Sequence, residues 1–389
     1  MMSFDEQPDE DFDLADSDTA GQPQPVETSV NGLDATETEV AAEDEGLSHR
    51  RINIRRALAN RRLDKYLAGR IGSQVSRTAL QGYIREGMVT VNGRTVKPSY
   101  KIRTNDAIDM LLPVVKPREI PPEPIPLDVL YEDDDLMALN KQADLIVHPA
   151  RGNWSGTLVN GLAYYFQQNW RDIKTLPING EVFRPGIVHR LDRDTTGVIL
   201  IAKSELALWR LGKQFELRKT AKTYNAIVHG IVSLDEDVID APIGRHPKIR
   251  EKYAVHRKTG RPFPGTLKSA VTRYKVVQRL VEVGRGRQSF TVMELHPKTG
   301  RTHQIRVHMS FLGHPIIGDR MYGGGPLYMS MLEGRHDVAE GPLITRQALH
   351  AHDIEFNHPR TNERMKIEAP WPKDFTETLK VLQEMAKKV

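Results

Sequence analysis

The pattern of apolar and polar positions predicts strands joined by turns over much of the chain. Residues 198–202 form an unbroken apolar run, which is typical of a strand buried on both faces. Residues 204–217 repeat leucine and phenylalanine at helical spacing, so we expect a helix that packs against the strands. Strand patterns also cover 129–131 and 136–139, on either side of four acidic residues at 132–135. Because Asp favours turns through local hydrogen bonds, we interpret this acidic cluster as a turn in preference to a metal site.

A further strand-like alternation lies at the end of the segment 290–309. It places His303 on the face that carries Ile305, and Arg306 and His308 on the opposite face. A regular strand would therefore direct the two histidines away from each other. We predict no metal site among them, and expect the histidines to bind backbone groups or phosphates.

The first basic region predicts a small unit of two helices and a hairpin. Helical spacing begins at Leu63, and Ser76 is expected to cap a second helix that Gly87 ends. The Asn92-Gly93 pair is a strong hairpin signal between two short strands, and residues 107–112 close the sheet.

Composition divides the chain into four segments. Residues 1–47 hold 15 acidic and no basic side chains, few aromatics and no apolar periodicity, so a disordered acidic tail is expected. Residues 48–112 form the small basic unit, residues 113–126 are a proline-rich linker, and residues 127–389 form the large domain. Without the tail the formal charge is about +19, which indicates a polyanionic partner.

Further features of composition exclude several classes of protein. The chain of 389 residues has no cysteine, so disulfides, thiolate metal sites and cysteine nucleophiles are excluded. No apolar run approaches the roughly 20 residues needed to span a bilayer, and the acidic N-terminus lacks a secretory pattern. We therefore expect a protein located in the cytoplasm, with no membrane partner. We also expect a monomer.

The candidate chemistry concentrates in the segment 186–203, which reads GIVHRLDRDTTGVILIAK. Its polar part directly precedes the buried strand, so Asp192 and Asp194 lie on a loop that a rigid element positions. A glycosidase pair is a weak hypothesis, because such carboxylates normally come from separate elements. The PKTG tetrapeptide at 297–300 lacks the context of a nucleotide-binding loop, which disfavours nucleotide hydrolysis and dinucleotide chemistry.

Several strings carry a resemblance to known families. Residues 62–108 are similar to the S4 RNA-binding domain, although a merely solvated basic face is the simpler alternative. VLYEDDDLMALNKQADLIVHP, GIVHRLDRDTTGVILIAKS, KTYNAIVHG and TGRTHQIRVHMSFLGHPIIGDRMYGG resemble the motifs of RluA-type pseudouridine synthases, more closely the RluD-like branch that modifies large-subunit ribosomal RNA. Gln142, Asp144 and Thr196 depart from the family pattern; Asp tolerates the left-handed turn expected at 144.

The resemblance implies an α+β fold, with a mixed, mainly antiparallel sheet, a central catalytic cleft and a small S4-type α/β domain before it. It implies Asp192 as the essential carboxylate, either as nucleophile on the ribose or as base at its 2′ carbon. It also implies Arg306 as the partner that keeps Asp192 ionised, and Tyr224 as the tyrosine that packs on the target base and moves the carbon 5 proton. An ordinary strand tyrosine is the alternative for Tyr224. The resemblance implies no cofactor.

Other basic residues are candidates for RNA binding. Arg190 is implied to enter the helix where the uridine leaves, or to contact a phosphate. Arg301 is a candidate for RNA binding and is also assigned to packing against the backbone or within its motif. The remaining RNA-binding candidates are His189, Arg77, Arg85, Lys97, Arg245 and Lys248.

The function implied is isomerisation of specific uridines to pseudouridine, most of all in large-subunit ribosomal RNA. The alternative is a non-catalytic S4-type ribosome-assembly factor, and a small-sugar glycosidase is a third class. The joint presence of Asp192, Tyr224 and Arg306 favours the enzyme, because a pure RNA binder does not require them. Residues 326–345 match no motif and receive no role.

Overall fold

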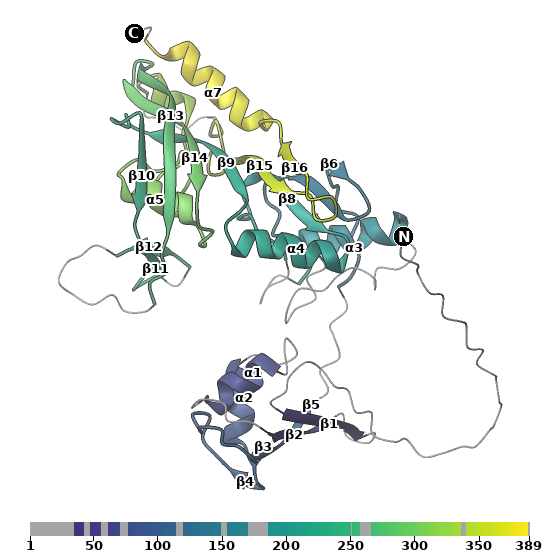
Figure 1. Cartoon of the computed structure of the whole chain (residues 1–389). Helices are drawn as coiled ribbons and strands as arrows, with labels where there is room; N and C mark the ends of the chain where they lie inside the picture. Colours follow the sequence, from purple (N-terminus) through teal and green to yellow (C-terminus); the bar gives the residue numbers. More distant parts are fainter. Residues whose placement is uncertain are drawn as a thin grey trace, which may run out of the picture. The chain divides into compact units, whose positions relative to one another are not determined.

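The structure is a computed structural model of the chain, and its contacts divide it into two compact units, Met1–Lys116 and Pro117–Val389 (Figure 1). The described residues are 35–42, 47–55, 61–70, 77–113, 120–148, 154–169, 186–249, 251–256, 266–335 and 340–387. In this part of the chain no helix is long and apolar enough to cross a bilayer.

The N-terminal unit packs two helices on a sheet with the strand order β1-β2-β5-β3-β4. Its elements are β1 (Ala35–Ala42), β2 (Leu47–Ile54), α1 (Leu63–Arg70), α2 (Arg77–Arg85), β3 (Val89–Val91), β4 (Arg94–Thr95) and β5 (Ala107–Pro113). Leu63 and Leu67 of α1 share a buried core with Ile84 of α2 and with Ile108 and Met110 of β5. The predicted helices and hairpin are confirmed, and Asn92 and Gly93 both have positive φ, as a two-residue hairpin turn requires. The cap expected at Ser76 lies outside the described residues.

The prediction of a disordered tail through residue 47 is wrong for residues 35–42. They form β1, which pairs antiparallel with β2 and places Glu39 opposite Arg50 in the register. Composition alone does not reveal this pairing, because the open edge of β2 supplies the hydrogen-bonding partner. The strand β2 was also missed by the apolar pattern, since arginines occupy its middle.

Asp64 is the polar centre of the N-terminal unit. Its carboxylate is fully buried and accepts hydrogen bonds from Arg62 (2.9 and 3.0 Å), Arg77 (3.2 and 2.7 Å) and Gln81 (2.7 Å). The hydrogen bonds from Arg62 lower the pKa of Asp64 well below its usual value, and those from Arg77 and Gln81 act in the same direction.

We expect Asp64→Asn to destabilise the N-terminal unit by about 2–4 kcal/mol, because it weakens charge-assisted hydrogen bonds at a buried site. Hydrogen exchange of the full chain, followed at the amides of α1 and α2, measures this loss. Since the folded pKa of Asp64 is lowered, the stabilisation is present above pH about 4 and is lost as the pH falls further. Asp109→Asn is the control, because the ion-pair partners of that partly exposed carboxylate among the described residues, His49 and Arg51, lie 3.7 Å away. Equal losses in both variants would contradict the assignment.

The C-terminal half of the predicted linker belongs to the large unit. Ile125 and Leu127 pack against its core, and the Nδ2 of Asn160 donates to the carbonyl of Pro121 at 2.9 Å. The carboxylate of Glu123 accepts a hydrogen bond from the amide of Gly156 at 2.9 Å. The semi-rigid linker predicted over 113–126 is therefore too long, because the extended chain that proline favours here still partly buries its apolar side chains against the core of the large unit.

The large unit is built on a nine-stranded sheet with the order β10-β13-β14-β9-β15-β8-β7-β6, in which β16 also pairs with β15. Its strands are β6 (Val129–Glu132), β7 (Leu136–Lys141), β8 (Thr196–Ala202), β9 (Ala221–His229), β10 (Glu236–Asp240), β11 (Ile243–Arg245), β12 (Tyr253–Val255), β13 (Val271–Val283), β14 (Gln288–Pro297), β15 (Leu349–Asn357) and β16 (Arg364–Glu368). Its helices are α3 (Leu158–Asn169), α4 (Glu205–Glu216), α5 (Gln304–Phe311), α6 (Met329–Leu332) and α7 (Lys373–Met385). Of the named strand pairs only β15 with β8 is parallel, so the predicted mixed, mainly antiparallel α+β fold is confirmed.

The strand β8 is buried on both faces, as its apolar run predicts. Ile199 and Ile201 join the core that contains α3, whereas Val198 and Leu200 join the core that contains Ala207 and Leu211 of α4. The predicted helix at 204–217 is confirmed, and the hydroxyl of Ser204 caps α4 by accepting the Ala207 amide at 3.1 Å. This packing gives the polar loop before β8 a rigid base.

The strand predicted over 303–309 is wrong, because Gln304–Phe311 form the helix α5. All residues from 304 to 309 are buried, so the helix has no polar face from which its period could be recognised. Its first turn is fixed by Gln304, whose Oε1 accepts the Thr299 hydroxyl at 2.6 Å and the Arg301 amide at 3.1 Å.

Candidate active site

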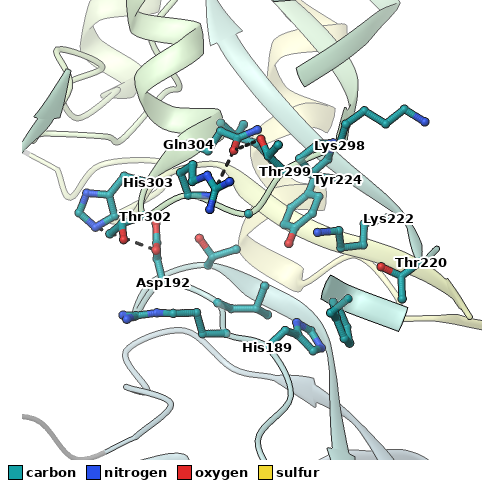
Figure 2. A pocket seen from close by; sticks show the side chains of 18 of the residues that line it. His189, Asp192, Thr220, Lys222, Tyr224, Lys298, Thr299, Thr302, His303 and Gln304 are labelled. Carbon is teal, nitrogen blue, oxygen red and sulfur yellow. Dashed lines mark hydrogen bonds and ion pairs between the residues drawn. The ribbon is translucent and has the colours of Figure 1, made fainter. Parts of the chain in front are cut away.

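A cleft of about 510 Å³ opens between the loop before β8 and the segment before α5 (Figure 2). The loop contributes residues 188–192, β9 contributes Lys222 and Tyr224, and the second wall is formed by residues 297–306. All three predicted catalytic residues, Asp192, Tyr224 and Arg306, line this cleft, although they come from widely separated parts of the chain.

The loop that carries Asp192 is held from behind by Lys141. This lysine is only 1% exposed, and its Nζ donates to the carbonyls of Gln142, Leu145 and Arg193 at 2.8–2.9 Å. Burial lowers the pKa of Lys141 to about 7. The left-handed turn expected at Asp144 is present, with φ 59°, and its carboxylate pairs with Arg193.

We expect Lys141→Met to lower kcat by roughly 10- to 100-fold with little change in KM, because the freed carbonyls no longer fix the loop. For the reaction that the resemblance implies, tritium release from RNA labelled at carbon 5 of uridine measures both constants. Lys203→Met is the matched control: Lys203 is also a buried lysine, but its Nζ donates to Glu132 at 2.7 Å and to the Asp133 carbonyl, which do not belong to the loop that carries Asp192. A control variant that loses as much kcat at equal thermal stability would contradict this positioning role.

Arg306 joins two carboxylates at the floor of the cleft. Its Nη1 donates to Asp192 at 3.1 Å, while Nε and Nη2 bind both oxygens of Asp319 at 2.7 and 2.9 Å. Burial alone would lower the pKa of Arg306. The hydrogen bonds and charge of Asp319, together with the charge of Asp192, outweigh burial and raise this pKa. The bidentate pair fixes the guanidinium, so its third nitrogen points at the Asp192 carboxylate.

The residue Asp319 is 1% exposed and follows a glycine in a constrained turn. Gly318 has φ 77°, and a Cβ there would lie 2.0 Å from the carbonyl oxygen of Arg346. Only glycine therefore fits, and the turn it makes directs Asp319 toward Arg306.

His303 forms the wall beside Asp192. It has φ 56°, a left-handed conformation that costs free energy in a residue other than glycine, and it precedes α5. Its Nδ1 lies 2.8 Å from the Tyr322 hydroxyl, and its Nε2 lies 4.0 Å from Asp192. Burial lowers the pKa of His303, so the ring is neutral near pH 7.

Tyr224 projects from β9 into the cleft, and Figure 2 shows it beside Lys222, with His189 on the opposite wall. It packs against two hydrophobic cores, so its ring is supported from behind. Burial, followed by the charge of Asp192, raises the pKa of Tyr224, and the phenol is therefore protonated at neutral pH.

The predicted RNA-binding residues fall into separate groups. Arg190, Arg301 and His189 all line the cleft, and Arg190 is exposed. The Nε of Arg301 donates to the Ser269 carbonyl at 3.0 Å, which agrees with its assignment to backbone packing. His189 accepts the Leu200 amide at 2.9 Å, and burial lowers its pKa to about 3; these contacts lie within the protein, so its RNA contact stays a prediction.

The other candidates do not line the cleft. Arg85 and Lys97 share a groove of the N-terminal unit, whereas Arg77 is bound to Asp64. Arg245 ends β11 and Lys248 follows it; both are exposed. Their contacts with RNA stay predictions.

The acidic turn and the histidines were weighed as metal sites, and their side chains have protein partners. The Asp133 carboxylate accepts the amides of Asp135 and Leu136, which is the predicted turn, and it also binds His358 at 2.8 Å. The side chains of Asp133, Asp135 and His358 have ligand atoms within 4.8 Å of one another. The carboxylate of Asp135, however, is paired with Arg360 at 2.7 Å. The cluster is explained as a hydrogen-bonded turn.

Similarly, His308 lies 2.9 Å from Thr272 and 3.0 Å from the Ala241 carbonyl. Its burial within the sheet–helix core separates it from His303, which faces the cleft.

The sequence did not single out Asp319, Lys141 or Lys222. Asp319 and Lys141 lie inside strings that carry the family resemblance, and an ionisable residue inside an apolar or glycine-rich motif was the available signal. Lys222 lies two residues before Tyr224, so strand periodicity could have placed it on the same face.

Comparison with known proteins identifies the class. A family model of RNA pseudouridylate synthases matches residues 135–311, and a model of the S4 domain matches residues 61–108. The chain is 40% identical over 323 residues to the RNA pseudouridine synthase YlyB of Bacillus subtilis, and this match covers 83% of this chain and 94% of the relative. The chain belongs to the RNA pseudouridine synthase family, and it is an isomerase with an N-terminal S4 domain.

Two further matches describe the relationship. The chain is 38% identical over 328 residues to ribosomal large subunit pseudouridine synthase D of Pasteurella multocida, with 83% of this chain and 91% of the relative covered. Among solved structures, human RNA pseudouridylate synthase domain containing 4 matches with a TM-score of 0.51 and 25% identity, covering 66% of this chain and 93% of that chain. The alternative of a non-catalytic assembly factor is not favoured.

Proposed function

We propose that this enzyme isomerises uridines of large-subunit ribosomal RNA to pseudouridine, acting as a monomer in the cytoplasm. The observation that carries the reaction is the convergence of Asp192, Arg306 and Tyr224 in one cleft. The RNA class is supported by the similarity to ribosomal large subunit pseudouridine synthase D and by the S4 domain.

In this reaction the bond between ribose C1′ and uracil N1 breaks, and a bond between C1′ and C5 forms. C5 loses a proton and N1 gains one, so the atoms balance without a redox step. We propose that Asp192 begins the reaction, either by attacking C1′ or by removing the C2′ proton. Both routes require an ionised carboxylate that is held close to the ribose.

Arg306 meets this requirement. Its guanidinium donates to Asp192 from a position that the Asp319 pair has already fixed, so little reorganisation is needed when substrate binds. The same charge lowers the cost of placing the Asp192 carboxylate in a partly closed cleft.

Tyr224 supplies a flat, supported surface for the detached uracil and a hydroxyl that faces the cleft. Because its phenol is protonated in the free enzyme, we propose that Tyr224 gives its own proton to the uracil, which gains one at N1, and then takes the proton that C5 loses, so the tyrosine ends in its starting form. We propose that Arg190, which is exposed and lines the cleft, fills the space in the RNA from which the uridine is extruded.

The RNA class is tested with unmodified transcripts of large-subunit ribosomal RNA, small-subunit ribosomal RNA and transfer RNA, each labelled with tritium at carbon 5 of uridine. We expect release from the large-subunit RNA only. Release confined to another class would contradict the proposed substrate while leaving the enzyme class intact.

A further inference from the structure

Lys222 is a partly buried cation of the cleft to which the mechanism above gives no role. It lies on β9, and among the described residues no hydrogen bond or ion pair is formed by its ammonium group. Its neighbour is the Phe215 ring, whose centroid is 6.0 Å from Nζ, at the outer limit of a cation–π contact. Burial lowers the pKa of Lys222 to about 8. A partly buried cation for which the described residues supply no counter-ion favours a ligand of opposite charge.

The charges around Lys222 favour an anion. The titratable side chains that line the cleft near it are His189, Glu216, Arg218 and Lys298, with Tyr224 and Asp192 deeper in the cleft. His189 is neutral, since burial lowers its pKa to about 3, and Asp192 is bound to Arg306. Positive charge therefore exceeds negative charge at this end of the cleft.

Lys222 also lies where the cleft meets a second groove of about 560 Å³, which shares Arg218, Thr220, Lys222, Pro297 and Lys298 with it. The second groove adds Lys219 and Lys275 to these cations. Its two carboxylates are paired, Glu236 with Arg273 at 2.7 Å and Glu294 with His296 at 2.8 Å. A basic path thus leads away from the cleft and begins at Lys222.

The distance to the reaction follows from the strand. Residues two apart on a strand lie on one face at a spacing of about 7 Å, and Lys222 and Tyr224 share the face that lines the cleft. A ligand of Lys222 therefore lies within about one nucleotide of a base that packs on Tyr224.

We propose that Lys222 binds a phosphate of the RNA strand next to the extruded uridine, and that this strand continues over the second groove. The proposal rests on the proposed function, because it names a contact of the same substrate. Lys222 is then a binding residue, which fixes the register of the strand while Asp192 acts on the ribose.

The test is a double-mutant cycle between protein and RNA. An oligoribonucleotide that spans the mapped target uridine is prepared with a neutral methylphosphonate at one linkage at a time, on either side of the uridine. We expect Lys222→Met to raise KM by about tenfold with kcat within about threefold. At one linkage the methylphosphonate should raise KM for the wild type but cause no further rise for the Met variant.

Lys275→Met is the matched control, because this exposed lysine lines the second groove only. The rise in KM that Lys275→Met causes should be additive with the rise that the methylphosphonate coupled to Lys222 causes. If the Lys222 effect is additive with every methylphosphonate while the wild type releases tritium, the phosphate contact is overturned and the proposed function stands. If the wild type releases tritium from no RNA, both are overturned.

A second measurement follows the charge of Lys222. A bound phosphate favours the ammonium form, so RNA binding takes up a proton above pH 8 and affinity falls as the pH rises from 8 to 9. Lys222→Arg keeps the charge at these pH values, and we expect it to bind RNA with a flat profile over this range. Affinity is measured in the Asp192→Asn background so that the RNA stays unreacted. An equal decline in the Arg variant would contradict the proposal.

Discussion

Asp192→Asn is expected to lower kcat by at least about a thousandfold while leaving folding and RNA affinity nearly unchanged. The amide keeps the shape of the side chain and its contact with Arg306, but it removes the negative charge that both routes require. Single-turnover tritium release measures the rate, and a binding assay on the same RNA measures the affinity.

Asp194→Asn is the matched control, since it makes the same change two residues away on the same loop. Asp194 does not line the cleft, so we expect its kcat to stay within about tenfold of the wild type. If Asp192→Asn and Asp194→Asn lowered kcat equally, the loss would come from a general disturbance of the loop. That result would contradict the specific role of Asp192.

Arg306→Met is expected to cost about 3–5 kcal/mol of folding stability and to lower kcat at least about a hundredfold. The substitution leaves the buried Asp319 carboxylate without its bidentate partner, and it leaves Asp192 without its counter-ion. Chemical denaturation of the large unit measures the first effect, and tritium release measures the second. Arg320→Met, at an exposed position in the same motif, should change neither.

Combining Arg306→Met with Asp319→Asn separates the two effects. The double variant no longer buries an unpaired carboxylate at position 319, so much of the lost stability should return. Turnover should stay low, because Asp192 still lacks its partner. If turnover returned with stability, the contribution of Arg306 to the reaction would be structural only.

Local patterns in the sequence predicted the elements whose period survives in the fold. The strand β8 and the helix α4 were predicted within a residue or two, because one is buried on both faces and the other on one face only. The helix α5 was predicted as a strand, since a helix buried all round retains no amphipathic period. The strand β1 was missed because its partner, the edge of β2, is visible only in three dimensions.

The same distinction applies to the site. Asp192, Tyr224 and Arg306 were named through family resemblance, and the fold brings them to one cleft. Asp319, the residue that fixes Arg306, could not be inferred from spacing, because the pair depends on how the turn at Gly318 approaches α5. Lys141 was hidden for a similar reason, since its three acceptors come from two segments that only the folded chain places together.

The central claim is that this chain converts uridine to pseudouridine in large-subunit ribosomal RNA through Asp192. The most direct measurement maps pseudouridine by carbodiimide-dependent stops of reverse transcription on an unmodified large-subunit transcript, after incubation with the full chain or with its Asp192→Asn variant. We predict new stops at discrete uridines with the wild type and none with the variant. Identical stops with both proteins would contradict the account. So would the absence of stops with either protein on the large-subunit, small-subunit and transfer RNA transcripts.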